Sequence, residues 1–336
     1  MNQNAVLTLI LNFRTPDLTI AAAQAALDEM QPCRGEVVVI DNGSGDDSFE
    51  RLRGEAETRG WLKGGKLRVV ASDCNGGFGA GMNIGFRMMM SDGSKPDFFY
   101  LLNSDAIPEP GAVQALLTHM TKWDQIGLCG SFVQGPDGAP HRTAFRFPSI
   151  AGEFEAAAYT GVVSRLLSDS IVAMEIPEAE GRVDWTAGAS LLVRSDMIDD
   201  VGAFDETFFL YFEETDLCHR AMEAGWETHY VPQSRVVHIG SASTGMKSWD
   251  RVPQYWFDSR LHYFTKTHGQ VYAGLATLAR LSGGLIWRLR RFLQRRPELD
   301  APNFLRDLLG HYVRSFKRGV RTRPAPRTFA LTEDRK

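Results

Sequence analysis

Short apolar runs alternate with helix-patterned segments over the first 110 residues of the chain. The runs at residues 5–11, 36–40, 67–71 and 98–102 are compact and apolar, which is typical of strands buried on both faces. Residues 16–30 have helical spacing, a charged helix follows up to about residue 60, and residues 75–83 open a Met-rich helix. Strand, helix and strand at this spacing predict right-handed crossovers and a parallel sheet with covered faces. We therefore expect an α/β, Rossmann-like architecture.

Polar side chains follow three of these predicted strands. The three loops are Asn12-Phe-Arg-Thr-Pro16, Asp41-Asn-Gly-Ser44 and Asn103-Ser104-Asp105. The carboxyl ends of parallel strands meet at one edge of the sheet, which is where open α/β folds bind their ligands. Asp41 can accept hydrogen bonds from a pyrimidine imide or a ribose, and loop amides can meet phosphate oxygens. A plain turn is the alternative interpretation of the Asp41 loop.

The Asn103-Ser104-Asp105 triplet ends an aromatic and aliphatic run and precedes the turn formers Pro108, Pro110 and Gly111. Two oxygen ligands one residue apart can hold a divalent cation against a diphosphate. The alternative is that Asp105 caps the next helix. The glycines at positions 76, 77, 79 and 81 follow the third strand and lack the G-x-G-x-x-G order, which disfavours NAD binding.

Composition limits the protein class. A chain of 336 residues with 43% hydrophobic content can form one large domain plus an appendage. The four cysteines have no Cys-x-x-Cys spacing, so neither a zinc site nor a disulfide framework is indicated, and a reducing cytoplasm fits. The sequence shows neither a leader pattern nor an apolar run of about 18 residues, so we expect neither secretion nor a membrane span.

The C-terminal region is basic although the net charge of the chain is only −4. Residues 280–323 hold twelve Arg or Lys against three acidic residues. Apolar residues recur at helical spacing from Leu275 to Phe292, beside a stripe formed by Arg288, Arg291 and Arg295. Such a helix can lie in a membrane interface near anionic lipids, or it can pack on the main domain with a solvated basic edge. Nucleic-acid binding is disfavoured because no aromatic residues interleave with the arginines.

Several motifs together resemble the donor-binding and catalytic parts of family 2 inverting glycosyltransferases, in the branch of bacterial rhamnosyltransferase-like enzymes. The resemblance covers residues 5 to about 270. The motifs that carry it are Asn12-Phe13, Val39-Ile-Asp-Asn-Gly-Ser44, Asn75-Gly-Gly-Phe-Gly-Ala-Gly-Met-Asn83, Leu101-Leu-Asn-Ser-Asp105, Asp184-Trp-Thr-Ala-Gly-Ala189, Phe204-Asp-Glu-Thr-Phe-Phe-Leu-Tyr-Phe-Glu-Glu-Thr-Asp-Leu-Cys-His-Arg220 and Gly225-Trp226. The resemblance implies a GT-A fold, a nucleotide-diphosphate sugar donor, and Mg²⁺ or Mn²⁺ at the diphosphate.

The resemblance also implies roles for donor-side residues. Asp41 would contact the base or ribose with Asn12 and Arg14 nearby, while Asn75, Gly77 and Asn83 would line the donor. Asn103-Ser104-Asp105 would be the D-x-D-type motif, with Asn at its first position and Asp105 as the principal metal ligand. His238 lies where related enzymes place a metal-binding histidine, and a strand-end or core histidine is the alternative.

Inversion in one displacement requires a base on the face opposite the leaving diphosphate. The candidates are Glu213, Glu214 and Asp216. Related enzymes usually have Glu-Asp-x-Asp here, and the resemblance gives the base role to the second position, which is the longer Glu214 in this chain. An acidic helix N-terminus is the alternative interpretation. Asp184, Trp185, Gly188 and Ala189 are expected on the acceptor side, and residues 131–183 are expected to be an irregular insertion that shapes it.

We expect a catalytic domain at residues 1–270, divided into a nucleotide-sugar half (1–110) and an acceptor half (111–270). A basic helical extension (271–319) and a disordered tail (320–336) would follow. The predicted activity is metal-dependent transfer of a sugar to a cell-surface polysaccharide or lipid-linked glycan, and we expect the sugar to be L-rhamnose from dTDP-rhamnose. A cytoplasmic enzyme, peripheral at the inner face of the membrane, fits this activity. A sugar nucleotidyltransferase and an inactive sugar-nucleotide-binding partner are the alternatives.

Overall fold

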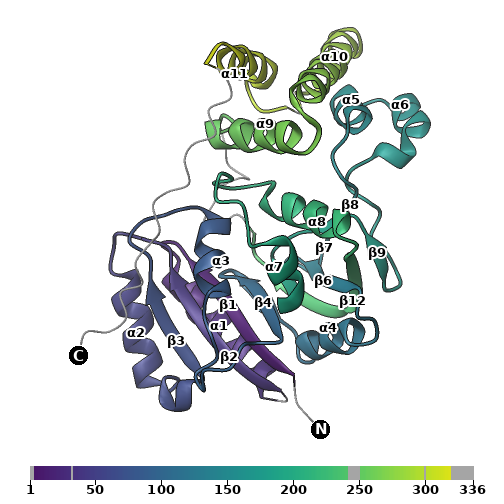
Figure 1. The fold of residues 1–336 in the computed structure, drawn as a ribbon. Helices are drawn as coiled ribbons and strands as arrows, with labels where there is room; N and C mark the ends of the chain where they lie inside the picture. Colours follow the sequence, from purple (N-terminus) through teal and green to yellow (C-terminus); the bar gives the residue numbers. More distant parts are fainter. Residues whose placement is uncertain (1–3, 32, 241–249, 299, 319–336) are drawn as a thin grey trace.

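A mixed sheet flanked by helices organises the chain (Figure 1). The computed structural model describes residues 4–31, 33–240, 250–298 and 300–318, so the expected disordered tail lies outside the described residues. The main path of the sheet, in spatial order, is β3 (Leu67–Ala71), β2 (Arg34–Asp41), β1 (Ala5–Asn12), β4 (Phe98–Asn103), β11 (Ser190–Arg194), β6 (Ile126–Gln134), β12 (Glu227–His238) and β5 (Ala106–Pro108). The strands β7 (Pro140–His141) and β9 (Gly181–Val183) pair with its second half, and β8 (Ala144–Phe145) pairs with β10 (Trp185–Thr186) in a small separate sheet.

The four strands predicted from apolar runs are all present and parallel to one another. The sheet becomes mixed at β11, which lies antiparallel between β4 and β6. Asp105 is followed by β5 rather than by a helix, so the helix-cap interpretation of this residue is wrong. Strand β5 pairs antiparallel with β12, with Ala106 opposite His238. This pairing brings the end of β12 to the loop that carries Asp105.

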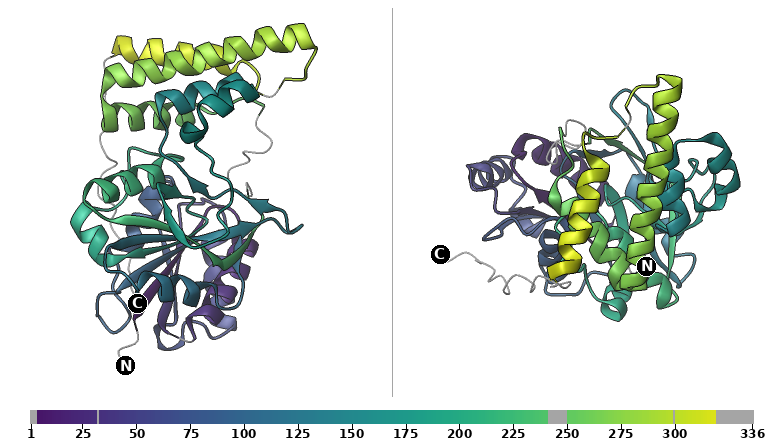
Figure 2. Two further views of the ribbon diagram at one scale, coloured as in Figure 1. Left: turned by 90° about the vertical axis from the view of Figure 1, so that its right-hand side faces the viewer. Right: turned by 90° about the horizontal axis from the view of Figure 1, so that it is seen from above.

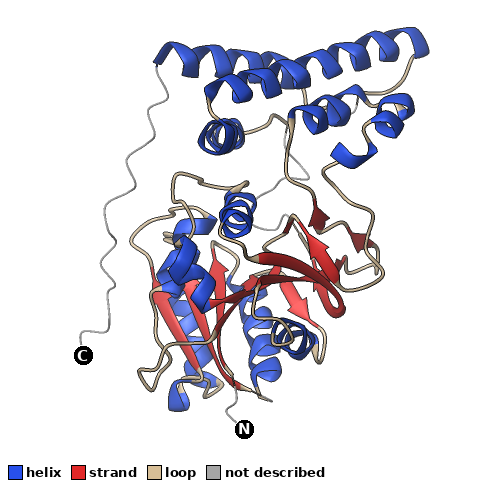
Figure 3. Ribbon diagram, turned by 45° about the vertical axis from the view of Figure 1, so that its right-hand side comes forward, coloured by secondary structure: helices blue, strands red, loops and turns tan. Residues whose placement is uncertain are grey.

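Helices cover both faces of the sheet (Figure 3). One face packs against α1 (Pro16–Met30), α2 (Ser48–Thr58) and α4 (Ala112–Met120). The other face packs against α3 (Phe78–Phe86), α7 (Ser195–Val201) and α8 (Glu213–Glu223). Two short 3-10 helices lie at Lys63–Gly65 and Ser168–Ser170. The predicted Met-rich helix, α3, begins at Phe78 and ends at Phe86, so the methionines at 88–90 lie outside it.

A separate group of helices lies beyond the strand ends of the sheet (Figures 1 and 2). We call it the helical layer, and it consists of α5 (Ile150–Ala158), α6 (Gly161–Leu166), α9 (Gln254–His268), α10 (Gln270–Gln294) and α11 (Phe304–Arg318). The Arg260 guanidinium of α9 is 2.8 Å from the Glu153 carboxylate of α5, and both groups are buried. Close packing of α10 on α5 requires Gly283, because a Cβ there would lie 2.5 Å from the Phe154 carbonyl oxygen. Two segments distant in sequence thus form one layer.

The expected insertion is partly regular, because β6 continues to Gln134 and α5 and α6 follow it. Its first helix packs with helices from beyond residue 250, and only Gly269, at φ 87°, separates α9 from α10. The division at residue 270 stays a prediction. Among the described residues, we find no helix that combines the length and the apolar character needed to span a bilayer.

Candidate active site

One pocket of about 830 Å³ lies between the strand ends and the helical layer. Its wall includes residues predicted for four different tasks, which are donor binding, cation binding, base catalysis and acceptor binding. The predicted residues that line it are Asn75, Gly77, Asn103, Ser104, Asp105, Trp185, Gly188, Ala189, Glu213, Glu214 and His238. The predicted residues that are not part of its lining are Asn12, Arg14, Asp41, Asn83, Asp184 and Asp216. The site is therefore assembled from loops that are more than 200 residues apart in the chain.

Asp41 organises the loops at the ends of β1 and β2. Its Oδ1 accepts a hydrogen bond from Asn12 Nδ2 at 2.7 Å, and its Oδ2 accepts one from the Ser44 amide at 3.2 Å. Arg14 donates from Nε to the Ser44 carbonyl at 2.8 Å. Asp41 is buried. Through these hydrogen bonds Asn12, Arg14 and Asp41, all predicted for the donor side, connect the two loops next to the pocket. The Asp41 loop thus adjoins the pocket through the next residue, Asn42.

Asn42 is a pocket residue that the sequence prediction did not single out. Its Nδ2 donates to Asn75 Oδ1 and to the Gly77 carbonyl, each at 3.1 Å. Its buried Oδ1 has no hydrogen-bond partner among the described residues, which is a costly arrangement unless a ligand supplies a donor. The sequence signal for Asn42 is its position directly after Asp41 in the motif Val39-Ile-Asp-Asn-Gly-Ser44. Asn83 instead clamps Phe204 through hydrogen bonds of 2.9 and 3.0 Å to its backbone.

Gly77 makes a close backbone contact on the same wall. Its φ is 90°, and a Cβ at this position would lie 1.8 Å from the Phe209 carbonyl oxygen. The loop of residues 75–77 and the segment before α8 therefore approach each other so closely that only glycine fits at position 77. This contact fixes the distance between the donor-side loop and the acidic residues of α8.

Asp105 and His238 form a pair at the pocket wall. The Asp105 Oδ1 atom is 3.0 Å from His238 Nε2, and Asn103 Nδ2 is 3.3 Å from the same nitrogen. The pairing of β5 with β12 brings them together, and His238 is indeed the last residue of its strand. The Ser104 Oγ atom, also in the pocket lining, is 3.3 Å from Thr15 Oγ1. Over the described part of the chain, no cluster of three His, Cys, Asp or Glu side chains has metal-binding geometry.

Glu213 and Glu214 open helix α8 at the opposite wall. The two residues before them, Tyr211 and Phe212, have φ values of 69° and 70°, an unusual left-handed pair for bulky side chains. Glu214 Oε1 accepts a hydrogen bond from the Gly188 amide at 3.1 Å. Burial raises the pKa of Glu214. Burial, reinforced by the negative charge of Glu214, raises the pKa of Glu213 well above its usual value, and Glu213 Oε2 is without a hydrogen-bond partner among the described residues.

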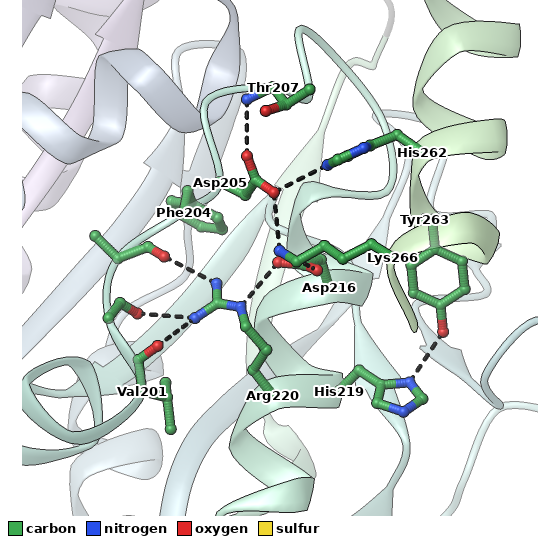
Figure 4. A network of polar contacts seen from close by, with 12 residues as sticks. Val201, Phe204, Asp205, Thr207, Asp216, His219, Arg220, His262, Tyr263 and Lys266 are labelled. Atoms are coloured by element: carbon green, nitrogen blue, oxygen red, sulfur yellow. Dashed lines mark hydrogen bonds and ion pairs between the residues drawn. The ribbon is translucent and has the colours of Figure 1, made fainter. Parts of the chain in front are cut away.

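Asp216 points away from the pocket into a network of ion pairs (Figure 4). Its oxygens lie 2.9 Å from Arg220 Nε and 2.7 Å from Lys266 Nζ. Lys266 also contacts Asp205 at 2.8 Å, which ties α9 to the loop before α8. Burial opposes ionisation of Asp205, but hydrogen bonds from His262, Lys266 and Thr207 outweigh it and hold its pKa well below the usual range. The structure therefore separates Asp216 from the two glutamates, and its catalytic role stays untested.

The motif predicted for the acceptor side contributes an aromatic wall to the pocket. Trp185 stacks on Phe145 with ring centroids 4.1 Å apart, and its Nε1 donates to the Arg146 carbonyl at 2.9 Å. Asp184 lies behind it, where it accepts a hydrogen bond from the Phe147 amide at 2.8 Å. The helical layer adds lining residues that the sequence did not indicate, among them Tyr255, Trp256 and Arg280. Arg142, also unpredicted, lines the pocket, is exposed and has no ion-pair partner among the described residues.

Comparisons with known proteins agree with this geometry. Residues 33–257 match the model of "Glycosyltransferase like family 2". N-acetylglucosaminyl-diphospho-decaprenol L-rhamnosyltransferase of Mycobacterium tuberculosis is 31% identical over 186 residues, which are 53% of this chain and 61% of the relative. Rhamnosyltransferase WbbL of Escherichia coli is 45% identical over 56 residues, or 17% of this chain and 21% of that protein. The chain thus matches less than two thirds of the length of these curated relatives.

Solved structures show the same fold. The mannosyltransferase PcManGT from Pyrobaculum calidifontis, in complex with GDP-Man and Mn²⁺, superimposes with a TM-score of 0.56 at 13% identity, covering 94% of this chain and 86% of that one. GalNAc-T7 with UDP, GalNAc and Mn²⁺ superimposes with a TM-score of 0.54 at 14% identity, covering 94% and 57%. The expected GT-A fold is therefore confirmed. With its family match over residues 33–257, the chain belongs to glycosyltransferase family 2.

Proposed function

We propose that the protein is a metal-dependent inverting glycosyltransferase that transfers a sugar from a nucleotide diphosphate to a glycan. One observation carries the proposal: the Asp105–His238 pair and the two glutamates at the start of α8 line the same pocket. A cation-binding pair and a carboxylate base facing one cavity are what a single displacement at an anomeric carbon requires. The names of the relatives favour L-rhamnose as the transferred sugar and a lipid-linked glycan as the acceptor. The proposed donor is dTDP-rhamnose, and a cell-surface polysaccharide is the other proposed acceptor.

The donor would occupy the side of the pocket formed by the ends of β1, β2 and β4. Asn42 Oδ1 is a buried acceptor in need of a donor group, which a base or ribose can supply. Asp41, with Asn12 and Arg14, would hold the adjoining loops in place. Gly77 brings backbone close to this region without a side chain in the way. Nucleotide and diphosphate would then lie next to Asp105.

The Asp105–His238 pair fits a divalent cation. A carboxylate oxygen and an imidazole nitrogen 3.0 Å apart converge on one point, and both are ligands that Mn²⁺ accepts. Only two protein ligands are needed, because Mg²⁺ and Mn²⁺ at such sites take further oxygens from substrate phosphates and water. A bound cation would neutralise the charge that develops on the leaving diphosphate. Mn²⁺ in the structures of PcManGT and GalNAc-T7 supports a metal of this kind.

Glu214 would act as the base. The Gly188 amide holds its Oε1, and the second oxygen can accept the proton of the acceptor hydroxyl. As that proton moves to Glu214, the acceptor oxygen bonds to the anomeric carbon, and the bond from that carbon to the diphosphate oxygen breaks. Its raised pKa makes Glu214 a stronger base than an exposed glutamate, which favours proton abstraction near neutral pH. Trp185 and Trp256 offer flat apolar surfaces to the acceptor sugar, and Arg142 offers a positive charge to an anionic group on it.

The two alternatives from the sequence have less support. A sugar nucleotidyltransferase does not need a carboxylate base beside the sugar, and the family match does not favour it. An inactive binding partner would not need to keep the Glu213 carboxylate buried beside Glu214, since burying such a group is costly.

The test is calorimetric titration with dTDP-rhamnose, UDP-glucose, UDP-galactose, UDP-N-acetylglucosamine and GDP-mannose, each with and without Mg²⁺ or Mn²⁺. Metal-dependent binding of one donor is expected, with dTDP-rhamnose tightest. Transfer is then followed with a lipid-linked glycan acceptor, and the anomeric configuration of the product is read by NMR. No binding across the panel, or a product that retains the donor configuration, would contradict the proposal.

A further inference from the structure

The outer face of the helical layer is apolar and uncovered by any described residue. On α10 the exposed large apolar residues form one stripe, which we call the outer stripe: Val271, Leu275, Leu278, Leu285, Ile286, Leu289, Phe292 and Leu293. Their exposed fractions range from 39% to 82%, although they belong to a well-formed helix of 25 residues. Soluble proteins seldom expose contiguous apolar surface of this kind without a partner. Seen from above in Figure 2, α10 and α11 lie in front of the rest of the chain.

The opposite face of α10 explains why this helix can leave its outer stripe exposed. Trp287, Ala276 and Ala273 are buried against the layer and lie about half a turn from the outer stripe. Helix α10 thus packs on the protein with one face and leaves the other, apolar face exposed. The membrane-interface interpretation stays a prediction. Helix α11 lies against α10, where Leu305 meets Gly284, and it adds exposed Leu309, Val313 and Phe316.

Charge distinguishes between the possible occupants of this face. Arg288, Arg295 and Arg296 at the end of α10 are exposed and have no ion-pair partner among the described residues. Helix α10 contains no Asp or Glu, and the one acid of α11, Asp307, is bound to Arg251. A second copy of the chain on the outer stripe would thus offer these arginines no free carboxylate on either helix. Repulsion between like charges disfavours that pairing.

From the exposed apolar surface and the arginines left unpaired among the described residues we infer that the outer stripe and these arginines bind the surface of an anionic lipid bilayer. Leucines and Phe292 would enter the boundary between headgroups and acyl chains, and the arginines would pair with lipid phosphates. Arg280 lies on the same helix and lines the pocket, so docking would hold the pocket about one helix diameter, ~10 Å, from the lipid headgroups. An acceptor carried on a lipid would then reach the pocket, a consequence that depends on the proposed function; the docking itself does not.

The experiment is co-sedimentation of the full chain with vesicles of phosphatidylcholine, alone or with about 30 mol % phosphatidylglycerol. We expect binding to the anionic vesicles that weakens with added salt. Leu289→Glu should weaken it by about tenfold or more, because it removes one inserted leucine and adds a repelled charge. Replacing Arg288, Arg295 and Arg296 together by Gln should weaken it by about a hundredfold. Met89→Glu, at another exposed apolar residue, is the matched control and should bind as the wild type does.

Each other outcome counts against the inference. If Leu289→Glu binds anionic vesicles as strongly as Met89→Glu does, the outer stripe does not contact the lipid surface. If the wild-type protein does not bind anionic vesicles, the inference that it docks on a bilayer is wrong. If light scattering then shows a dimer that Leu289→Glu dissociates, a second copy covers the stripe instead. Donor titration of the same variants separates this test from the proposed function, because loss of vesicle binding with intact donor binding concerns the lipid surface alone.

Discussion

Substitution of Glu214 by Gln tests the proposed chemistry most directly. Gln has the same length, and its amide oxygen can still accept the 3.1 Å hydrogen bond from the Gly188 amide. The fold and the donor site should therefore persist while the proton acceptor is lost. A positioned base typically accelerates a reaction by about 10² to 10⁴, so turnover should fall by that factor, or about 3–5 kcal/mol on the barrier.

The pH profile gives a second signature of the same group. Glu214 must be ionised to accept a proton, so wild-type turnover should fall as the pH drops through its pKa. Burial raises that pKa above the ordinary value of 4.5, so the fall should begin at higher pH than for an exposed glutamate. In Glu214→Gln this acidic limb should vanish from the residual rate, because the group that titrates is gone.

Steady-state transfer, monitored by release of nucleotide diphosphate between pH 5 and 9, is a suitable assay. Donor affinity by calorimetry serves as the control and should stay within about twofold of the wild type. The neighbouring Glu213→Gln is the matched variant, since it changes an adjacent carboxylate at the same wall. If Glu214→Gln keeps near wild-type turnover while Glu213→Gln loses it, the base is Glu213 and the reasoning from the Gly188 contact fails.

Three further predictions follow from the same geometry. Asp105→Ala should abolish the dependence of donor affinity on Mg²⁺ or Mn²⁺, measured by calorimetry; unchanged affinity in both conditions would remove Asp105 from the cation site. Asp216→Asn should lower the unfolding free energy by about 3 kcal/mol, because it breaks a buried ion pair, and denaturant titration should show this while donor affinity stays unchanged. Gly77→Ala should lower both the melting temperature and donor affinity, since its Cβ would overlap the Phe209 carbonyl oxygen; a wild-type melting curve would contradict this.

Much of the fold could be predicted from local sequence pattern. Apolar runs that are bounded by polar or glycine-rich loops predict buried strands with helices between them, and β1, β2, β3 and β4 were located in this way. Parallel strands place their carboxyl ends at one edge, so the loops after Leu11, Ile40 and Leu102 had to converge. The motif Asn103-Ser104-Asp105 was therefore identifiable as part of the site before any contact was known.

Tertiary structure alone determined which acids face the pocket and what covers it. Along the sequence, Glu213, Glu214 and Asp216 are equivalent carboxylates, and only the positions of Gly188 and Lys266 separate the two at the pocket from the one in an ion pair. Likewise, α5 and α10 become one layer through contacts across more than 100 residues, and this decides which face of α10 remains apolar and exposed. Local pattern reports the preferences of neighbouring residues, whereas burial and partner choice depend on segments that meet only when the chain has folded.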